Sequence, residues 1–332
     1  MSAIEETLGQ TVAAVEVRKS SMPTVARLVL LLGLLVIPLG VSDFVVFQVT
    51  TVLIYAIAIL ALNLLTGASG QFSLGQSAFY AVGAYTAAIM MEVYGVNYAL
   101  TLPAAGVICF LFGFLFGLPA LRLSGVYLAL ATFALAVAMP QIPKLAVLEP
   151  WTGGVHGLVV NKPEAPFDLP LSQDAWLYYF TLSVAVVIYW LCANLLRSRT
   201  GRAMLAVRDN EIAASALGVD LSLYKTLAFG TSAAFTGVAG ALGAIVVQFV
   251  APDSFTFQLS IAIFVGMIVG GVGWLPGSLV GAVFIVFVPN LAEGISKGLS
   301  GAVFGVILFA VIFALPHGAR QIADWIAKRL PR

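Results

Sequence analysis

The side chains best able to act on a solute are amides and hydroxyls in one glycine-rich segment, residues 63–85. This segment contains no Asp, Glu, Lys or Arg. Its hydrogen-bonding candidates are Asn63, Gln71, Ser73, Gln76 and Ser77. Neutral groups can bind a polar solute and release it, whereas strong fixed charges would trap a zwitterion. We therefore predict that these residues line or gate a path for a small polar solute.

Glycines Gly67, Gly70, Gly75 and Gly83 interrupt the same segment. Glycine weakens a helix by about 1 kcal/mol relative to alanine, but it permits sharp turns and lets helices approach closely. One interpretation is tight helix packing, with the hydroxyls bonded back to the backbone. The other is a broken or re-entrant helix beside a water-filled path, since irregular backbone at membrane depth needs protein or a cavity around it. The residues alone leave both open.

Residues 197–222 carry the densest run of charge in the chain. Asp209 or Asn210 can cap the start of a helix, Glu211 suits the positive end of its dipole, and Gly218 can end it. The pattern predicts a two-turn helix, preceded by another turn that starts near Thr200. Its small apolar face consists of Ile212, Ala213, Ala216 and Leu217.

Two interpretations fit this predicted helix. It can lie at the membrane interface, with its arginines on the cytoplasmic side. It can also dock into a groove on a cytoplasmic partner, as amphipathic helices do. Small residues on the apolar face favour contact with protein, because insertion into lipid prefers Trp, Phe and Leu.

The residues that are missing exclude several kinds of chemistry. The middle of each long apolar segment lacks the buried carboxylate or histidine of a proton relay, although sodium coupling through carbonyls and hydroxyls stays open. There is no G-x-x-x-x-G-K-[ST] run to bind ATP phosphates. If the chain drives uphill transport, the energy must therefore enter through another subunit.

Metal and cofactor sites are also not expected. His156 and His317 are the only histidines and fall on opposite sides of the predicted topology. Cys109 and Cys192 lie in apolar runs, where they act as small hydrophobic residues.

The elements that position these residues are membrane spans. Of 332 residues, 61% are hydrophobic and only 9% are charged, whereas soluble domains carry about 25% charged residues. The net charge of +1 gives no reason to expect a nucleic-acid partner. The composition predicts an integral membrane protein with the lipid bilayer as its surroundings.

Ten segments approach the length of about 20 apolar residues that a helix needs to cross a bilayer. They are residues 24–41, 44–65, 72–91, 98–121, 124–142, 175–196, 223–250, 257–275, 276–292 and 299–316. We predict an all-α polytopic membrane protein, a bundle of about 10 (8–10) transmembrane helices, some of them short or broken.

Lys and Arg residues predict the orientation. If both termini are cytoplasmic, thirteen of the sixteen lie inside and only Lys144, Lys162 and Lys297 lie outside. We expect an outer loop at 143–174 and an inner segment at 197–222. The predicted parts are a cytoplasmic N-terminal tail (1–22), a transmembrane domain (23–318) and a cytoplasmic C-terminal tail (319–332), with an uncleaved first span.

Several motifs together resemble one family. Residues 63–85 match the pattern NLLTGxxGQxSLGxxAFxxxGAY of branched-chain amino-acid ABC transporter permeases. Residues 208–220, RDNEIAASALGVD, resemble the coupling segment of that family. The glycine run 270–281 and Pro316-x-Gly318 resemble its late turn and closing motif, and Thr152-Gly153-Gly154 resembles the outer loop of its M-type (LivM-like) subunits. The resemblance covers residues 50 to 320.

The resemblance implies an ABC importer permease fold in a bacterial inner membrane, translocating branched-chain or related amino acids. It implies as partners two ATP-binding subunits, a second, H-type permease subunit and a periplasmic substrate-binding protein. It places ATPase coupling at Arg202, Arg208, Glu211, Ala213, Ala214 and Gly218. The predicted path or gate residues are then the five polar residues named above together with Gly67, Gly70, Gly75, Gly270, Gly271, Gly273 and Gly277. Ile212 stands between Glu211 and Ala213, so the match to the family's EAA-x-x-x-G motif is loose.

Two alternatives remain open at this stage. Related permeases handle urea, amides or other small polar solutes, and the sequence does not decide among these. A sodium-coupled transporter acting alone would also fit the apolar spans. A membrane-embedded enzyme is a poor fit, because the paired acids, metal ligands and nucleophile that it would need are missing.

Overall fold

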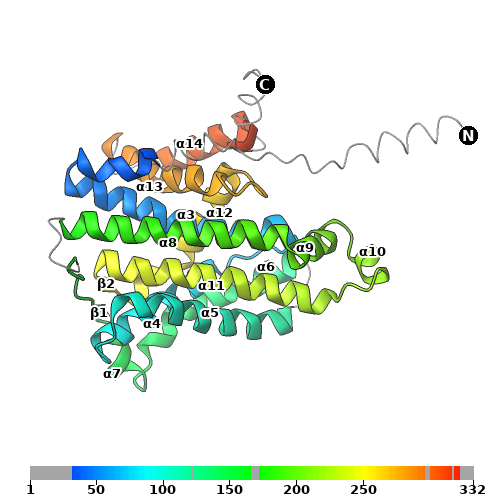
Figure 1. The fold of residues 1–332 in the computed structure, drawn as a ribbon, viewed down its shortest axis with the longest axis horizontal. Helices are drawn as coiled ribbons and strands as arrows, with labels where there is room; N and C mark the ends of the chain where they lie inside the picture. Colours follow the sequence, from blue (N-terminus) through cyan, green and yellow to red (C-terminus); the bar gives the residue numbers. More distant parts are fainter. Residues whose placement is uncertain are drawn as a thin grey trace, which may run out of the picture.

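The computed structural model is a bundle of helices, which confirms the predicted all-α polytopic class (Figure 1). It describes residues 32–120, 123, 125–165, 172–295, 300–315 and 318–321. The first part of the predicted span 24–41, the predicted N-terminal tail, most of the predicted C-terminal tail, Lys297 and His317 lie outside these residues.

The longer helices are α3 (Asp43–Ser69), α4 (Gln76–Glu92), α5 (Tyr98–Ala120), α6 (Val126–Ala138), α8 (Gln173–Arg197), α9 (Arg199–Asp209), α11 (Leu221–Val247), α12 (Phe257–Gly270), α13 (Gly277–Ile295) and α14 (Ser300–Ala314). The short elements are η1 (Ile37–Leu39), η2 (Met139–Lys144), α7 (Glu149–Thr152), β1 (Leu158–Val159), α10 (Glu211–Ala216), β2 (Phe249–Val250) and η4 (Pro252–Phe255).

Seven helical stretches in the described part of the chain are long and apolar enough to cross a membrane. Helices α4 and α14, with 17 and 15 residues, match two further predicted spans. Both are shorter than the roughly 20 residues that a straight span needs. The predicted short or broken spans are therefore present, and the predicted total of about ten is approximate.

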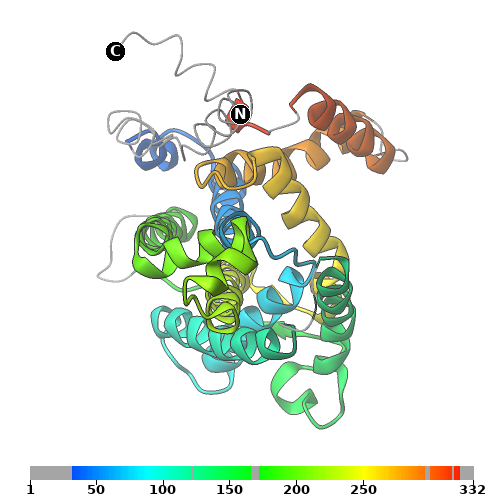
Figure 2. The ribbon, with the colours of Figure 1, turned by 90° about the vertical axis from the view of Figure 1, so that its right-hand side faces the viewer.

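Helix α3 forms the centre of the bundle. Every residue from Ala56 to Ser69 is buried, and the helix packs against α8, α11, α12 and α13. A helix that is apolar all round is expected in such a core. Figure 2 looks along the long axis and shows the spans end-on.

Helix α11 packs against α4 and α5 over most of its length. A Cβ atom added to Gly83 would collide with the carbonyl oxygen of Gly237, and one added to Gly240 would collide with that of Tyr80. Small residues allow the two backbones to approach closely. In lipid no hydrophobic effect drives helices together, so this tight van der Waals packing holds them instead.

Two predicted spans run well past the ends of their helices. The predicted span 257–275 is five residues too long, because α12 ends at Gly270. The predicted span 223–250 is three residues too long, because α11 ends at Val247 and Gln248 adopts a left-handed conformation with φ 62°. The next two residues form β2, which pairs antiparallel with β1 of the predicted outer loop. The Gln248 carbonyl accepts a hydrogen bond from the Val160 N–H, so the loop is fixed to the end of α11.

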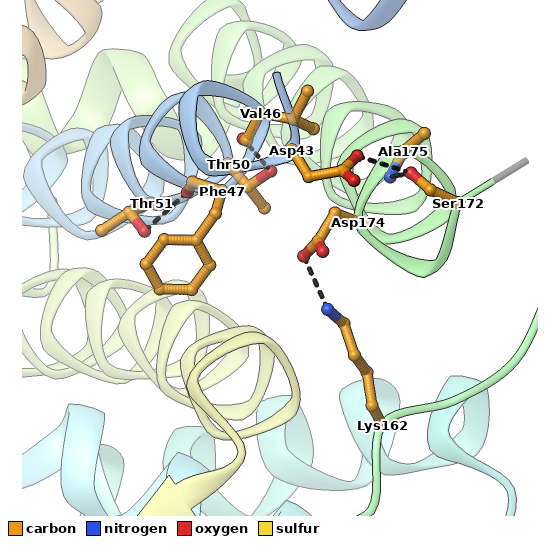
Figure 3. Close-up of polar contacts among 9 residues, drawn as sticks. All are labelled: Asp43, Val46, Phe47, Thr50, Thr51, Lys162, Ser172, Asp174 and Ala175. Atoms are coloured by element: carbon orange, nitrogen blue, oxygen red, sulfur yellow. Dashed lines mark hydrogen bonds and ion pairs between the residues drawn. The ribbon is translucent and has the colours of Figure 1, made fainter.

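At this loop end, polar side chains join the starts of α3 and α8 (Figure 3). The Ser172 hydroxyl donates to Asp43 at 2.9 Å and also accepts from the Ala175 N–H, capping α8. Lys162 pairs with Asp174 at 2.6 Å. Both acidic residues lie in the first turn of their helix, where the helix dipole favours negative charge.

The α4–α11 contact yields a stability prediction. Gly83→Ala should lower the free energy of unfolding by about 1–3 kcal/mol, because the methyl group overpacks a backbone contact. Gly305→Ala is the matched control, since nothing lies within 4 Å of a Cβ added there in α14. Thermal unfolding of the purified proteins in detergent should show a lower midpoint for Gly83→Ala only. Equal midpoints would contradict the predicted contact.

Candidate functional site

Asn63 connects the two glycine-rich regions that the sequence analysis singled out. It lies on α3 and is 2% exposed. Its amide nitrogen donates to the carbonyls of Gly271 and Trp274 at 3.2 and 3.1 Å. Its amide oxygen accepts from the Gly273 N–H at 2.6 Å. One side chain thus holds residues 271–276, here called the glycine turn, which joins α12 to α13.

The glycine turn needs glycine for steric reasons. Gly271 and Gly273 have φ values of 103° and 78°, a region that other residues rarely adopt. One helical turn after Asn63, a Cβ atom on Gly67 would lie 2.8 Å from the backbone of Gly273. A larger residue at Gly67 would therefore push the turn away from α3, whereas one at Gly273 would strain the left-handed backbone.

The ends of α12 and α13 also touch through glycine. A Cβ atom on Gly270 or Gly277 would collide with the other residue's carbonyl oxygen. Gly318, from the closing motif, lies against Gly271, and the Ala319 N–H donates to the Val269 carbonyl at 2.8 Å. The late glycine run and the closing motif therefore form one contact region.

Between α3 and α4 the chain is not helical over residues 70–75, here called the α3–α4 break. Gly70, with φ 71°, caps α3, and its N–H donates to the Thr66 carbonyl at 3.1 Å. The Leu74 N–H donates to the hydroxyl of Thr132 on α6 at 2.9 Å, and Gly75 lies against Thr132. The irregular backbone is thus surrounded by protein, as a break at membrane depth requires.

Side chains near the break are also hydrogen-bonded within the chain. Gln71 donates to Ser69 and to the Lys225 carbonyl, and the Ser73 hydroxyl accepts from the Gly75 N–H. These bonds fix the path of the break.

Helix α4 begins in the interior with Gln76 and Ser77. Gln76 accepts from Thr236 at 2.6 Å and donates to Ser232 at 3.3 Å, both on α11. The Ser77 N–H donates to the hydroxyl of Ser260 on α12 at 2.8 Å. In this conformation the neutral groups bond to protein, as the packing interpretation expects; that they line or gate a path stays a prediction.

The charged segment forms α9 and α10, at the opposite end of the bundle from α7 and β1 (Figure 1). Asn210 caps α10, because its side chain accepts from the Ala213 N–H at 3.0 Å. Gly218, with φ 82°, follows the end of α10. The predicted helix and its terminating glycine are thus confirmed, and of the two candidate caps, Asp209 and Asn210, the structure uses Asn210.

One face of α10 is apolar and exposed. Ile212 is 84% exposed and Leu217 is 83% exposed, whereas Ala214 on the opposite side is buried at 2%. Ala213 and Ala216 are exposed as well. In the described part of the chain nothing covers this face.

Two polar links join the charged segment to the spans. Arg208 donates to the Gly67 carbonyl at 2.6 Å and also pairs with Asp209. Glu211 pairs with Lys225 of α11 at 2.7 Å. Gln71 holds the backbone of Lys225, so the end of α3, the α3–α4 break and the start of α11 are tied together.

The structure brings Arg208 and Glu211 to the spans but places Arg202 differently. Arg202 donates to the carbonyl of Arg197 at the end of α8. Sequence reasoning had not included Lys225, Thr132, Ser232, Thr236 and Ser260 in the site. Their partners lie on other helices, so spacing along the chain carries no signal for them.

The described residues hold no group of three or more His, Cys, Asp or Glu side chains placed to bind a metal. Cys109 and Cys192 are free and buried.

Comparisons with known proteins agree with this architecture. A family model described as "Branched-chain amino acid transport system / permease component" matches residues 44–314. The chain is 35% identical, over 79% of its own length and 68% of theirs, to proteins of Salmonella typhimurium and Escherichia coli named "High-affinity branched-chain amino acid transport system permease protein LivM". A Salmonella typhi protein named "Autoinducer 2 import system permease protein LsrC" is 28% identical over 42% of each chain. No solved structure gives a significant match.

The Asn63 geometry yields a second prediction. Asn63→Asp keeps the shape but places a carboxylate oxygen against the carbonyls of Gly271 and Trp274, so a buried negative charge faces two acceptors and keeps only the Gly273 N–H as a donor. The expected loss of unfolding free energy is about 3–5 kcal/mol. Thermal unfolding in detergent, with protein yield as a second readout, measures it.

Asn97→Asp is the matched control for this substitution. The Asn97 side-chain oxygen accepts a hydrogen bond from the Ala99 N–H on an exposed turn. A carboxylate oxygen would accept this bond equally well. If Asn63→Asp unfolds at the same temperature as Asn97→Asp, Asn63 does not hold the glycine turn.

Proposed function

Because the chain belongs to the family of permease components of branched-chain amino acid transport systems, we propose that it is the membrane-spanning subunit of an ATP-driven importer. It would move branched-chain amino acids into the cytoplasm, with ATP hydrolysis carried out by partner subunits. The relatives' names supply this substrate class. The similarity to an autoinducer 2 permease keeps other small polar solutes as the alternative.

The observation that carries the proposal is the uncovered apolar face of α10, formed by Ile212 and Leu217. Two large aliphatic side chains exposed at the end of a charged segment are suited to a groove on a protein partner. We propose that each of two ATP-binding subunits docks beneath one permease subunit, and that α10 of this chain is the contact.

The links behind α10 explain how docking can act on the spans. Arg208 reaches Gly67, which lies against Gly273 of the glycine turn. Glu211 reaches Lys225, whose backbone is held by Gln71 of the α3–α4 break. A displacement of α10 would therefore be transmitted to the glycine turn and to the α3–α4 break, the two regions that we propose as path or gate. The connecting contacts do not involve lipid-exposed helices.

The charge distribution supports an energy source outside this chain. In the described spans, charged side chains lie near helix ends, such as Asp43, Asp174 and Lys225. A proton-coupled carrier would use a charged side chain inside the membrane. The middle of these described spans holds none. We propose that the α9–α10 end faces the cytoplasm of a bacterial inner membrane, with both termini on that side.

The remaining partners follow from the same proposal. A second, H-type permease subunit would complete the path, and a periplasmic binding protein would deliver solute at the end formed by α7, β1 and β2. Reconstitution in liposomes tests the whole scheme. Leucine or isoleucine uptake should require the ATP-binding subunits and ATP; uptake driven by a sodium gradient without them would favour a carrier acting alone.

The docking face gives a third prediction. Ile212→Asp should reduce ATP-dependent uptake by about tenfold or more, because a buried apolar contact is replaced by a charge at the centre of the interface. Co-purification of the ATP-binding subunits should fall with it. Val147→Asp, on a side chain 78% exposed in the segment between η2 and α7 at the opposite end, should leave co-purification unchanged. Equal retention of the ATP-binding subunits by both variants would remove α10 as the docking contact.

The turn after α10 gives a fourth prediction. Gly218→Ala and Gly95→Ala place the same side chain at φ 82° and 63°, and nothing lies within 4 Å of either Cβ. The cost of placing alanine in a left-handed conformation is similar at the two positions, about 1 kcal/mol. A difference in transport between the two variants therefore reflects where each glycine lies in the protein. Uptake should be lost in Gly218→Ala and in Glu211→Gln, while membrane insertion survives and Gly95→Ala stays active. Normal uptake by the first two variants would refute the coupling assignment.

A further inference from the structure

An apolar groove whose lining includes none of the proposed path or gate residues lies between α3, α8 and the start of α13. Its volume is about 390 Å³. Leu53, Ile57 and Leu60 line it from α3, and Leu182, Val186 and Trp190 line it from α8. Trp190 is 61% exposed, so the groove opens to the outer surface of the bundle, where the membrane lies.

The groove extends along α8. Its lining on α8 extends from Leu182 to Arg197, which corresponds to about 22 Å of helix. One leaflet contributes about 15 Å of hydrocarbon, half of the roughly 30 Å core. An acyl chain with its headgroup therefore matches the groove along its whole length.

The polar lining is concentrated at one end. Asn194, Arg197 and Ser278 lie there, beside the start of α9, and Arg197 is the charged residue of the lining. A guanidinium group binds phosphate oxygens through charge-assisted hydrogen bonds. The first turn of α13 adds the positive end of a helix dipole. The N–H groups of Gly277, Ser278 and Leu279 in this turn already donate to carbonyls of residues 274–276 in the glycine turn, so the dipole acts on the groove only through its field.

We propose that this groove binds one phospholipid, with an acyl chain between α3 and α8 and its phosphate against Arg197. The lipid belongs to the leaflet on the α9–α10 side. The described lining contains no acidic residue to hold an ammonium group, so an amino acid is a poor occupant. Arg197 ends α8 one residue before Ser198 caps α9, so the bound headgroup sits at the base of the charged segment.

The test uses the purified full chain in nanodiscs or mild detergent, without ATP-binding subunits. Native mass spectrometry measures retained lipid, and thermal unfolding is recorded with added phosphatidylglycerol or phosphatidylcholine. The wild type should retain one lipid and should be stabilised more by phosphatidylglycerol. Arg197→Ala should bind phosphatidylglycerol about tenfold more weakly, and Arg199→Ala, an exposed arginine two residues on and outside the lining, should bind it normally.

A second pair of variants tests the groove itself. Ala185→Trp fills it and should abolish retention of either lipid, whereas Val187→Trp, on a neighbouring exposed side chain outside the lining, should not. Equal binding by Arg197→Ala and Arg199→Ala, or lipid retained by Ala185→Trp, would overturn the proposal. So would crosslinking between Val186→Cys chains, which would make a second copy the occupant. Because no readout is transport, these outcomes are independent of the proposed import function.

Discussion

The structure depends on keeping an irregular backbone hydrogen-bonded where there is no water. The glycine turn and the α3–α4 break both place non-helical chain inside the bundle, and each unpaired amide there would cost several kcal/mol in a lipid-like surrounding. Asn63 supplies three bonds to the glycine turn. The Thr132 hydroxyl accepts from the Leu74 N–H of the break, and the Gln71 side chain ties the break to the Lys225 carbonyl of α11. Neutral amides and hydroxyls do this without the desolvation cost of a charge.

Glycine determines where these polar groups can act. Gly67 against Gly273 brings the glycine turn within reach of Asn63, and Gly270 against Gly277 closes the turn from the other side. The same device brings α4 to α11 through Gly83 and Gly237. The close backbone approach and the buried hydrogen bonds therefore depend on each other. An amide side chain reaches its partners only where no Cβ atom keeps the two backbones apart.

The two ends of the bundle are built differently. At the β1–β2 end, ion pairs and a short ladder close the surface around the starts of α3 and α8. At the α9–α10 end, the polar links point inward, from Arg208 to Gly67 and from Glu211 to Lys225, and the apolar side chains point outward. Such an arrangement suits an end that receives a partner and passes its movement to the spans.

The sequence by itself determined the class, the approximate spans and the stop at Gly218, and it narrowed the cap of α10 to Asp209 or Asn210, because composition, span length and helix-end preferences are local properties. It also singled out Asn63, Gln76 and the two glycine regions. Only the tertiary structure decided that Asn63 bonds to residues about 210 positions away and that Gln76 bonds to Thr236. It also moved the end of α11 to Val247. These facts depend on which helices become neighbours, and a pattern along one chain does not encode distances between its parts.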